Sequence, residues 1–331
     1  MKLFVTGGAG FIGSNYVHAA VESGNEVTVF DALTYAGNRL SLAAQEDNPN
    51  FHFVLGDVTD PDAVAGAIKG HDVVIHFAAE THVDRSIVDP HRFVATNCVG
   101  TSVVMRCALD AGIDRVVHVS TDEVYGSIDE GQFDEASLLE PSSPYSASKA
   151  GSDLIALSYQ VTYGLPVVVT RSSNQFGPYQ FPEKLIPLFI TNLIEGKPVG
   201  LYGDGLNVRD WLYVEDNVSG IDTVMRFGEV GKIYNIDGGN EMTNRDIAFR
   251  LVELCDADHS LVRFVEDRLG HDRRYAINGD NVRALGWQPR CTFDDALVAT
   301  VGWYKTNEDW WRPLKERSNH AGGNPKPGLR S

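Results

Sequence analysis

The residues Lys2-Leu3-Phe4-Val5-Thr6-Gly7-Gly8-Ala9-Gly10-Phe11-Ile12-Gly13 stand at the start of the chain and decide its fold. They predict a short apolar strand, a turn with the spacing Gly7-x-x-Gly10-x-x-Gly13 and a helix that begins at Phe11. Glycine lets the backbone turn tightly and approach a pyrophosphate at the helix N-terminus, where free N–H groups and the helix dipole favour an anion. A glycine pattern alone is a weak signal. In this strand–turn–helix context it predicts a dinucleotide site made by Gly7, Gly10, Phe11, Ile12 and Gly13.

Acidic residues after the next two strands extend this site. Asp31 follows the predicted strand at residues 26–30. A carboxylate there can accept hydrogen bonds from the adenosine ribose hydroxyls and repels a 2′-phosphate, so we expect NAD and not NADP. Asp57 and Val58 follow the third predicted strand and are expected to lie along the adenine. Asp57 by itself could equally cap a helix over residues 61–68, and the sequence leaves both interpretations open.

Strands and helices alternate along the first half of the chain. Apolar runs predict strands over residues 2–6, 26–30, 51–55, 73–77, 115–120 and 167–171. Helical patterns lie between them, over residues 11–23, 61–68, 91–111 and 144–163. Near-continuous apolar strands separated by helices are typical of a parallel sheet covered on both faces. The predicted fold class is therefore α/β, with a Rossmann-like, doubly wound parallel sheet.

The pattern changes after residue 171, where segments become shorter and helices are predicted over residues 185–195, 218–227, 244–255 and 293–305. We expect a mainly NAD-binding Rossmann domain over residues 1–174. A smaller C-terminal α/β region over residues 175–311 is expected to bind the substrate, with some exchange of strands and helices between the two. Residues 312–331 are rich in Pro, Gly, Lys and Arg and are expected to form a flexible tail.

The composition excludes several classes of function. The formal net charge of −17 argues against general binding to nucleic acid or to an anionic membrane. The four cysteines, Cys98, Cys107, Cys255 and Cys291, form no metal-binding spacing, so we expect no metal. No apolar run approaches membrane-spanning length, and Met1 leads directly into a strand without a signal peptide. We therefore expect a cytoplasmic protein.

Tyr145 and Lys149 are four residues apart and share one face of the predicted helix over residues 144–163. A free tyrosine, with a pKa of about 10, is a poor base at neutral pH. A nearby ammonium group and a positively charged nicotinamide ring favour the phenolate, which can remove a proton from a sugar hydroxyl while hydride leaves the same carbon. Such a pair is common by chance, but it is a strong signal after a glycine loop. The combination resembles the extended short-chain dehydrogenase/reductase family, over residues 2 to about 303.

Thr121, Asp122 and Glu123 follow the predicted strand over residues 115–120. In the family that the chain resembles, a Ser or Thr at this strand end hydrogen-bonds the reacting hydroxyl, and Thr121 matches it. Epimerases of that family typically continue with small residues, whereas this chain has two acids. Loss of water needs one protonated carboxylic acid for the leaving hydroxyl and one carboxylate for a carbon-bound proton, and adjacent acids in a closed site separate each other's pKa values. A solvated acidic loop is the alternative.

The segment Thr121-Asp122-Glu123-Val124-Tyr125-Gly126 closely resembles the dTDP-glucose 4,6-dehydratases, and the segments at residues 30–38, 78–84, 181–187 and 207–211 agree. The resemblance implies the substrate dTDP-glucose and a tightly bound NAD that is regenerated in each turnover. It also implies that Tyr145 deprotonates the 4-hydroxyl as C4 gives up hydride. Glu123 would then take the C5 proton while Asp122 protonates the departing 6-hydroxyl, and hydride would return to C6. The expected catalytic residues are Thr121, Asp122, Glu123, Tyr145 and Lys149.

The same resemblance implies further site residues. Those expected at the cofactor, besides the glycine loop, are Asp31, Leu33, Thr34, Asp57, Val58, Phe77, Ala78, Ala79, Thr96, Tyr145 and Lys149. Those expected at the nucleotide sugar are Thr81, Thr121, Asn174, Lys184, Leu185, Tyr202, Arg209, Asn244, Arg268 and His271. Arg209 and Arg268 suit a diphosphate, because a guanidinium makes paired hydrogen bonds to phosphate oxygens. Departures from the family pattern at Leu269, Gly200 and Gln175-Phe176 concern nucleotide contacts.

The predicted helices over residues 91–111 and 144–163 carry apolar residues on more than one face. In the family that the chain resembles, these two helices pair with their symmetry mates as a four-helix bundle, so we expect a homodimer.

Two other functions compete with a dehydratase: a nucleotide-sugar 4-epimerase, and a non-catalytic regulator that senses NAD on the same fold. Asp122 and Glu123 argue against the epimerase, and the complete catalytic set argues against the regulator. Thymidine and uridine nucleotides are not separated by the sequence, nor is the deoxysugar pathway that the product enters.

Overall fold

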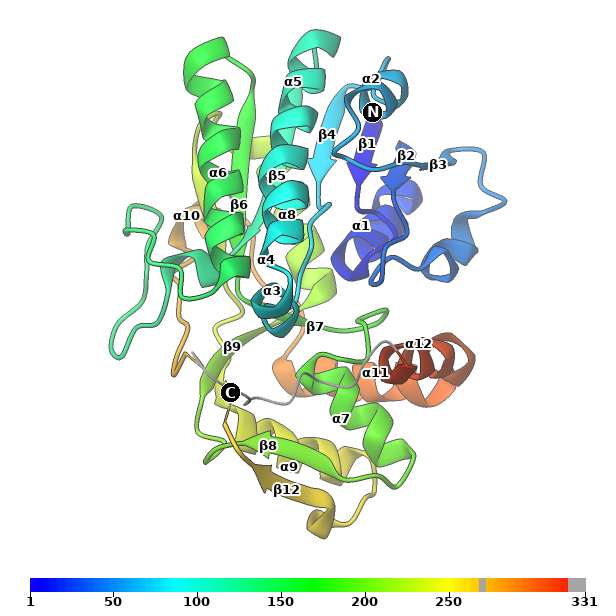
Figure 1. Cartoon of the computed structure of the whole chain (residues 1–331), viewed down its shortest axis with the longest axis vertical. Coiled ribbons are helices and arrows are strands. Elements are labelled where there is room, and N and C mark those ends of the chain that lie inside the picture. The colour runs from blue at the N-terminus through cyan, green and yellow to red at the C-terminus, as the bar shows by residue number, and fades with distance from the viewer. Residues whose placement is uncertain (268–271, 321–331) are drawn as a thin grey trace.

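The structure, a computed structural model, describes residues 1–267 and 272–320 (Figure 1). Its largest element is a parallel sheet of seven strands in the order β10-β6-β5-β4-β1-β2-β3. The strands are β1 (Lys2–Thr6), β2 (Glu26–Asp31), β3 (Phe51–Leu55), β4 (Val73–His76), β5 (Arg115–Thr121), β6 (Val167–Ser172) and β10 (Ile233–Ile236). The inner strands are buried along almost their whole length, which explains their near-continuous apolar sequence.

Helices cover both faces of this sheet. The face that buries Leu3 and Val5 carries α1 (Phe11–Glu22), α8 (Val214–Phe227) and α10 (Asp280–Ala284). The opposite face, which buries Phe4, carries α2 (Pro61–Ala67), α5 (Thr101–Ala111) and α6 (Pro144–Tyr163). Successive side chains of a strand point to opposite faces, so a doubly covered sheet needs apolar residues at every position. The predicted doubly wound α/β fold is confirmed.

The helix expected over residues 91–111 forms in three consecutive parts. These are α4 (Pro90–Phe93), the π-helical segment η2 (Val94–Gly100) and α5. The short helix α3 (Val83–Val88) precedes them, and 3-10 turns lie at η1 (Arg39–Gln45), η3 (Asp122–Tyr125) and η4 (His259–Leu261). The π-helical segment lies beside α6, and such segments often occur at functional sites.

The smaller part of the structure lies below the sheet in Figure 1. Its strands are β7 (Asn174–Phe176), β9 (Val208–Tyr213) and β11 (Glu241–Thr243) in one sheet, and β8 (Val199–Tyr202) and β12 (Val262–Val265) in another. Its helices are α7 (Leu185–Ile194), α9 (Asn244–Leu254), α11 (Phe293–Thr306) and α12 (Glu308–His320). These elements share a separate apolar core around Trp211, Ile247 and Trp311.

The two parts exchange elements, so the chain does not divide cleanly at residue 174. Strand β10 and helix α8 both come after this residue but belong to the large sheet and its covering layer. Ile233–Ile236 pairs in parallel with β6, at the edge of the sheet. The chain therefore crosses between the two parts more than once, and these crossings fix their relative placement.

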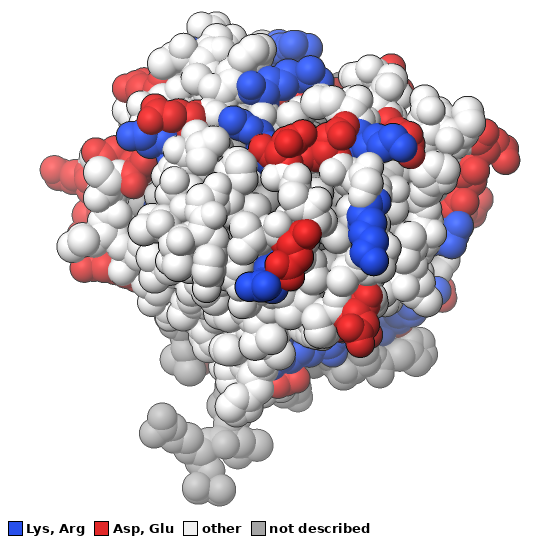
Figure 2. Space-filling model, turned by 90° about the horizontal axis from the view of Figure 1, so that it is seen from above, with Lys and Arg blue, Asp and Glu red and all other residues white. Residues whose placement is uncertain are grey.

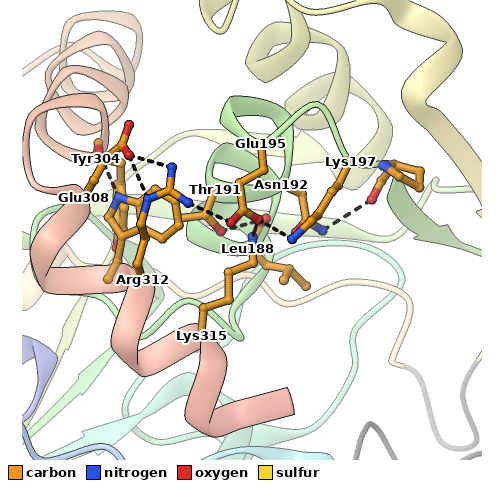
Figure 3. A network of polar contacts seen from close by, with 11 residues as sticks. Leu188, Thr191, Asn192, Glu195, Lys197, Tyr304, Glu308, Arg312 and Lys315 are labelled. Carbon is orange, nitrogen blue, oxygen red and sulfur yellow. Dashed lines mark hydrogen bonds and ion pairs between the residues drawn. The ribbon is translucent and has the colours of Figure 1, made fainter. Parts of the chain in front are cut away.

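The expectation of a loosely held tail from residue 312 is wrong for the first part of that tail. Residues 312–317 belong to α12, and Leu314 is buried in the core of the smaller part. Glu195, just after α7, accepts hydrogen bonds from Arg312 Nη1 at 3.1 Å and from Lys315 Nζ at 2.6 Å (Figure 3). Residues 321–331 lie outside the described part of the chain.

No helix within the described residues is long and apolar enough to cross a membrane. The described residues also contain no cluster of histidine, cysteine and acidic side chains that could hold a metal ion. On the face seen in Figure 2, lysine and arginine side chains lie interspersed with acidic ones and form no broad positive patch among the described residues.

Candidate active site

One cavity of about 530 Å³ lies at the carboxyl ends of β1, β2, β4 and β5, where open α/β sheets bind their ligands. Most of the site residues expected from the sequence line it. They are Gly7, Gly10, Phe11, Ile12, Gly13, Asp31, Thr34, Asp57, Val58, Phe77, Ala78, Ala79, Thr81, Thr96, Thr121, Asp122, Glu123, Tyr145, Lys149, Asn174 and Lys184. Residues more than 170 positions apart in the sequence thus meet at one surface.

The remaining expected residues are placed differently. Leu33, Leu185, Tyr202, Arg209 and Asn244 do not line this cavity. Leu33 packs against the core on the sheet face that α1 and α8 cover, and Leu185 packs against the core of the smaller part. Arg268 and His271, and the departure at Leu269, fall outside the described residues.

The glycine loop has the shape that an approaching pyrophosphate requires. Gly7 has φ +70°, and a Cβ atom at Gly13 would clash with the carbonyl oxygen of Gly7. Larger residues are therefore excluded at both positions. Gly10 is the N-cap of α1 and makes no side-chain cap, so the first-turn N–H groups remain available to an anionic ligand. This cradle fits a dinucleotide.

Asp31 is held rigidly at the end of β2. Its Oδ2 accepts a hydrogen bond from Ala9 N at 2.9 Å, and its Oδ1 accepts one from Leu33 N at 2.8 Å. Burial raises the pKa of Asp31, and these two backbone hydrogen bonds oppose the rise. Leu33 therefore contributes its backbone to the site, while its side chain turns into the core.

Asp57 is not the cap of the neighbouring helix. Asp60 occupies the N-cap of α2 and accepts hydrogen bonds from the backbone N–H groups of Asp62 and Ala63. Asp57 lines the cavity and accepts hydrogen bonds from Thr59. Of the two interpretations left open by the sequence, the capping role is therefore excluded, and the position of Asp57 in the cavity agrees with the other.

The acidic triplet lies where β5 ends in the cavity. Thr121 Oγ1 donates to Asp122 Oδ1 at 3.2 Å and accepts from Glu123 N at 3.3 Å. The Thr121 side chain also lowers the pKa of Tyr145, which places the two side chains close together. Asp122 is only 3% exposed and Thr121 and Glu123 are partly buried, so this segment is not a fully solvated acidic loop.

Burial and nearby negative charge raise the pKa values of both Asp122 and Tyr145. Burial, reinforced by Glu123 and Asp210, raises the pKa of Asp122 well above its ordinary range and favours the protonated acid. Burial, followed by Glu123 and Asp122, also raises the pKa of Tyr145. A positive charge beside Tyr145 is therefore required to form the phenolate. Lys149 Nζ donates to the carbonyl oxygen of Val119 at 2.8 Å.

Arg209 lies close to the triplet although it does not line the cavity. Its guanidinium is 4.2 Å from the centre of the Tyr275 ring, and its Nη2 donates to the carbonyl oxygen of Asp272 at 3.0 Å. Its charge lowers the pKa of Asp122, which places it near that carboxyl group. Tyr202 lies at the end of β8 and Asn244 at the start of α9.

The structure adds cavity residues that the sequence did not single out. Arg92 Nε is 2.8 Å from Glu80 Oε1, and both residues line the cavity wall. Gln180, Phe181 and Glu183 also line the cavity. Glu80 and Glu183 stand in segments that carry the family resemblance, so that signal could have found them, whereas Arg92 has no local signal.

The comparisons with known proteins agree with this geometry. A family model described as GDP-mannose 4,6 dehydratase matches residues 4–300. A dTDP-glucose 4,6-dehydratase of Streptomyces niveus is 50% identical over 332 residues, which cover 98% of each chain. Another, of Streptomyces antibioticus, is 52% identical over 325 residues and 96% of each chain.

Solved structures of two enzyme classes share the fold. A dTDP-glucose 4,6-dehydratase from Streptomyces venezuelae, with NAD and TDP bound, is 53% identical, with a TM-score of 0.93 over 95% of this chain and 100% of that chain. A UDP-glucose 4-epimerase from Thermus thermophilus, in complex with NAD, is 30% identical, with a TM-score of 0.87 over 93% and 100%. The fold alone therefore does not separate elimination from epimerisation.

Proposed function

Because the chain belongs to the extended short-chain dehydrogenase/reductase family, in the group matched by the GDP-mannose 4,6 dehydratase model, we propose that it is an NAD-dependent dTDP-glucose 4,6-dehydratase. The reaction converts dTDP-glucose into dTDP-4-keto-6-deoxyglucose and water. The observation that carries the proposal is the placement of Asp122 and Glu123, two acids that line one cavity beside Tyr145. Epimerisation needs only the tyrosine base, whereas elimination of water needs an acid and a second base.

NAD is the proposed cofactor. The glycine cradle, the N-terminus of α1 and the fixed carboxylate of Asp31 suit its pyrophosphate and adenosine ribose. When bound, NAD supplies a hydride acceptor that becomes a hydride donor later in the same turnover, so no external reductant is consumed. The side chain of Thr34 and the segment Phe77–Ala79 complete the proposed cofactor wall, with Thr96 opposite.

In the proposed oxidation, Tyr145 removes the proton of the 4-hydroxyl as C4 loses hydride. Thr121 holds the reacting oxygen through its hydroxyl. Lys149 contributes a positive charge that favours the phenolate, against the burial and the two acids that raise the pKa of Tyr145. The three residues come from β5 and α6, and this packed pair of elements fixes their relative positions.

In the proposed elimination, the new 4-ketone acidifies the C5–H bond. Glu123 takes the C5 proton, and the C–O bond at C6 breaks as Asp122 gives its own proton to the departing hydroxyl, which leaves as water. The raised pKa of Asp122 supports this assignment, because the side chain must hold a proton at neutral pH. Glu123 then returns its proton to C5 and C6 regains hydride, which gives the 4-keto-6-deoxy sugar. Tyr145 releases to solvent the proton that it took from the 4-hydroxyl, and Asp122 takes up one proton from solvent, so that all three side chains regain their starting states.

For the nucleotide sugar we propose contacts from Thr81, Asn174 and Lys184, which line the cavity, and from Arg209 beside it. Leu185, Tyr202 and Asn244 are retained as more distant candidates. A cation next to a diphosphate is needed in this chain, because the net charge of −17 provides no general attraction for an anionic substrate.

We also propose that two copies of the chain pair through the helical segment at residues 91–111, which includes η2 and α5, and through α6, as a four-helix bundle. The structure leaves Val99 in η2 and Leu154 and Val161 in α6 between 51% and 81% exposed. Val104 and Cys107, by contrast, are buried in the core of a single chain. An exposed apolar surface on two adjacent helices supports a protein partner there.

The decisive experiment incubates the purified protein with dTDP-glucose and no added reductant. We expect a 4-keto-6-deoxy sugar nucleotide, detected by its near-ultraviolet absorbance in alkali. UDP-glucose and a GDP-sugar serve as parallel substrates to establish which nucleotide is preferred. A C4 epimer would favour the epimerase, and no product with any sugar nucleotide would favour the regulator.

A further inference from the structure

Asp153 lies at the centre of a buried cluster of charged and titratable side chains that the proposed mechanism does not use. It is one helical turn beyond Lys149 on α6 and has no exposed surface. Arg171 Nε donates to Asp153 Oδ2 at 2.9 Å, and His118 Nε2 lies 3.2 Å from Asp153 Oδ1. Burying a carboxylate costs desolvation free energy even when it has such partners. The presence of Asp153 on the same helix as the proposed base Tyr145 therefore calls for an explanation.

The cluster ties α6 to the strand that ends in the acidic triplet. Lys149 Nζ donates to the carbonyl oxygen of Val119, and one turn later Asp153 contacts the side chain of His118, the residue before Val119 on β5. Arg171 comes from β6, where it pairs with Ser120 of β5. Asp153 therefore joins α6 to β5 and β6. Its contact on β5 is three residues before Thr121, and on α6 it lies two helical turns after Tyr145.

The cluster also determines the charge around Lys149, whose side chain is 5% exposed. Burial lowers the pKa of Lys149, and the charge of Asp153 is the largest influence that raises it. The other charged or titratable groups near Lys149 come from every element packed around it: His76 (β4), His118 (β5), Arg171 (β6), Cys98 (η2), Tyr145 (α6), and Asp122 and Glu123 beyond Tyr145 (η3).

The charge states of these neighbours leave Asp153 as the balancing anion. Burial lowers the pKa values of His76 and His118, so both rings are neutral at physiological pH. Burial alone would raise the pKa of Asp153, but His118, Arg171 and Lys149 together hold it below its ordinary value, so Asp153 is ionised. Arg171 opposes the influence of Asp153 on Lys149, because it carries the same sign of charge as the lysine.

We propose that Asp153 is a positioning residue for the reaction: its carboxylate keeps the buried Lys149 side chain as an ammonium ion and fixes it against β5, where it favours the phenolate of Tyr145. Arg171 and His118 hold Asp153 in place. This inference rests on the proposed function, because it takes Tyr145 and Lys149 as the base and its cation. It adds a residue that contacts neither substrate nor cofactor.

The test measures the titration of Lys149 itself. In protein labelled with [ε-¹³C]lysine and saturated with NAD, the Lys149 signal is identified by its loss in Lys149→Met. In Asp153→Asn we expect Lys149 to lose its proton at a pH lower by about one unit or more. In Arg171→Gln we expect a shift in the opposite direction. Ser152→Ala removes neutral hydrogen bonds to the His118 ring and to the backbone carbonyl oxygen of Lys149 but no charge, and it should leave the titration unchanged.

A second measurement follows reduced nicotinamide formation after dTDP-glucose is added, over a range of pH. The high-pH limb should move to lower pH in Asp153→Asn and to higher pH in Arg171→Gln, whereas a merely structural loss would lower the rate without opposite shifts. An unchanged Lys149 titration in Asp153→Asn, or shifts of the same sign in both variants, would overturn the proposal.

The experiment also remains decisive if Asp153→Asn does not fold, or if the wild-type protein is not a dehydratase. If Asp153→Asn does not fold, the double variant Asp153→Asn/Arg171→Gln replaces the buried pair by neutral amides. Its Lys149 must then titrate at lower pH than in Arg171→Gln, or the proposal is overturned. If the wild-type protein has no dehydratase activity, the proposed function fails, while the lysine titration still decides whether Asp153 controls the charge of Lys149.

Discussion

The carboxyl group of Asp122 occupies a position where ionisation is costly. One oxygen accepts a hydrogen bond from Thr121, and the other is buried without a hydrogen-bond partner among the described residues. Glu123 and Asp210 add negative charge nearby. The sequence predicted that one acid of the pair would be protonated, but Asp210 and the depth of burial come from tertiary structure and were not predictable from spacing.

A stability measurement can detect this cost. The folded-state pKa of Asp122 is raised above its unfolded value, so the native state gives up stability as the pH rises from about 4, the ordinary pKa of aspartate. Asp122→Asn stays neutral at every pH. We therefore expect its melting temperature to match that of the wild type near pH 4 and to exceed it increasingly toward pH 8, at equal NAD occupancy. A difference that does not depend on pH would contradict a protonated Asp122.

The role of Glu123 can be separated from that of Asp122 by isotope exchange. Glu123→Gln cannot accept the C5 proton, so we expect oxidation at C4 with slow accumulation of reduced-nicotinamide absorbance, no solvent deuterium at C5 and no product. Asp122→Asn is the matched control, because it keeps the base and should still exchange the C5 proton while losing the 6-hydroxyl slowly. Wild-type turnover by Glu123→Gln would remove Glu123 from the mechanism.

At the scale of elements, the sequence was informative where the hydrophobic pattern was continuous. All six predicted strands of the sheet, β1 to β6, lie within one residue of their predicted bounds. Strand β10 was missed, because Ile233–Ile236 is only four residues long and its apolar run is interrupted by the polar Asn235. Helix α12 was missed for another reason: it contains Pro313 and many charged residues, and its buried positions become evident only where it packs against α11 in the core of the smaller part.

We expect Glu195 to stabilise the packing of α12. One pair of variants tests this. Glu195 is 15% exposed and pairs with Arg312, Lys315 and Lys197, so Glu195→Gln leaves the nearly buried Lys315 without its carboxylate and should cost about 1–3 kcal/mol. In a chain of this length each kcal/mol lowers the melting temperature by about 1–2 °C. Because the pKa of Glu195 is lowered in the fold, its contribution is lost as the pH falls, and the difference should close in acid.

Glu308→Gln is the control for this pair. Glu308 also binds Arg312, but it is 39% exposed and makes a surface i,i+4 pair, which contributes about 0.3–0.5 kcal/mol. We expect the two glutamine variants to differ clearly in thermal denaturation at pH 7. Equal small effects would mean that Leu314 and Trp311 alone hold α12.

At the scale of the whole molecule, the cavity is assembled from segments that the sequence could order but could not bring together. The glycine loop, the triplet and the tyrosine–lysine pair meet because parallel strands end at one edge of the sheet, and this was predictable. Arg92 and Arg209 could not be placed in this way. The position of Arg92 depends on how α4 approaches Glu80, and that of Arg209 depends on the packing of β9 against Tyr275.

The outer surface of the molecule gives the last prediction. Helix α6 lies beside α5 (Figure 1). Leu154 and Val161 on α6 are 60% and 81% exposed, and Val99 in the adjacent η2 is 51% exposed, so a single chain leaves an apolar surface across neighbouring helices. Water contact over such a surface is unfavourable, and pairing with a second copy would remove it. We expect light scattering at micromolar concentration to give twice the chain mass, and Leu154→Glu/Val161→Glu to give a monomer. Val298→Glu is the matched control, since Val298 on α11 is 55% exposed but lies outside these helices, and it should leave the mass unchanged. A monomeric wild type, or loss of the dimer in the control alone, would show that this surface does not pair two chains.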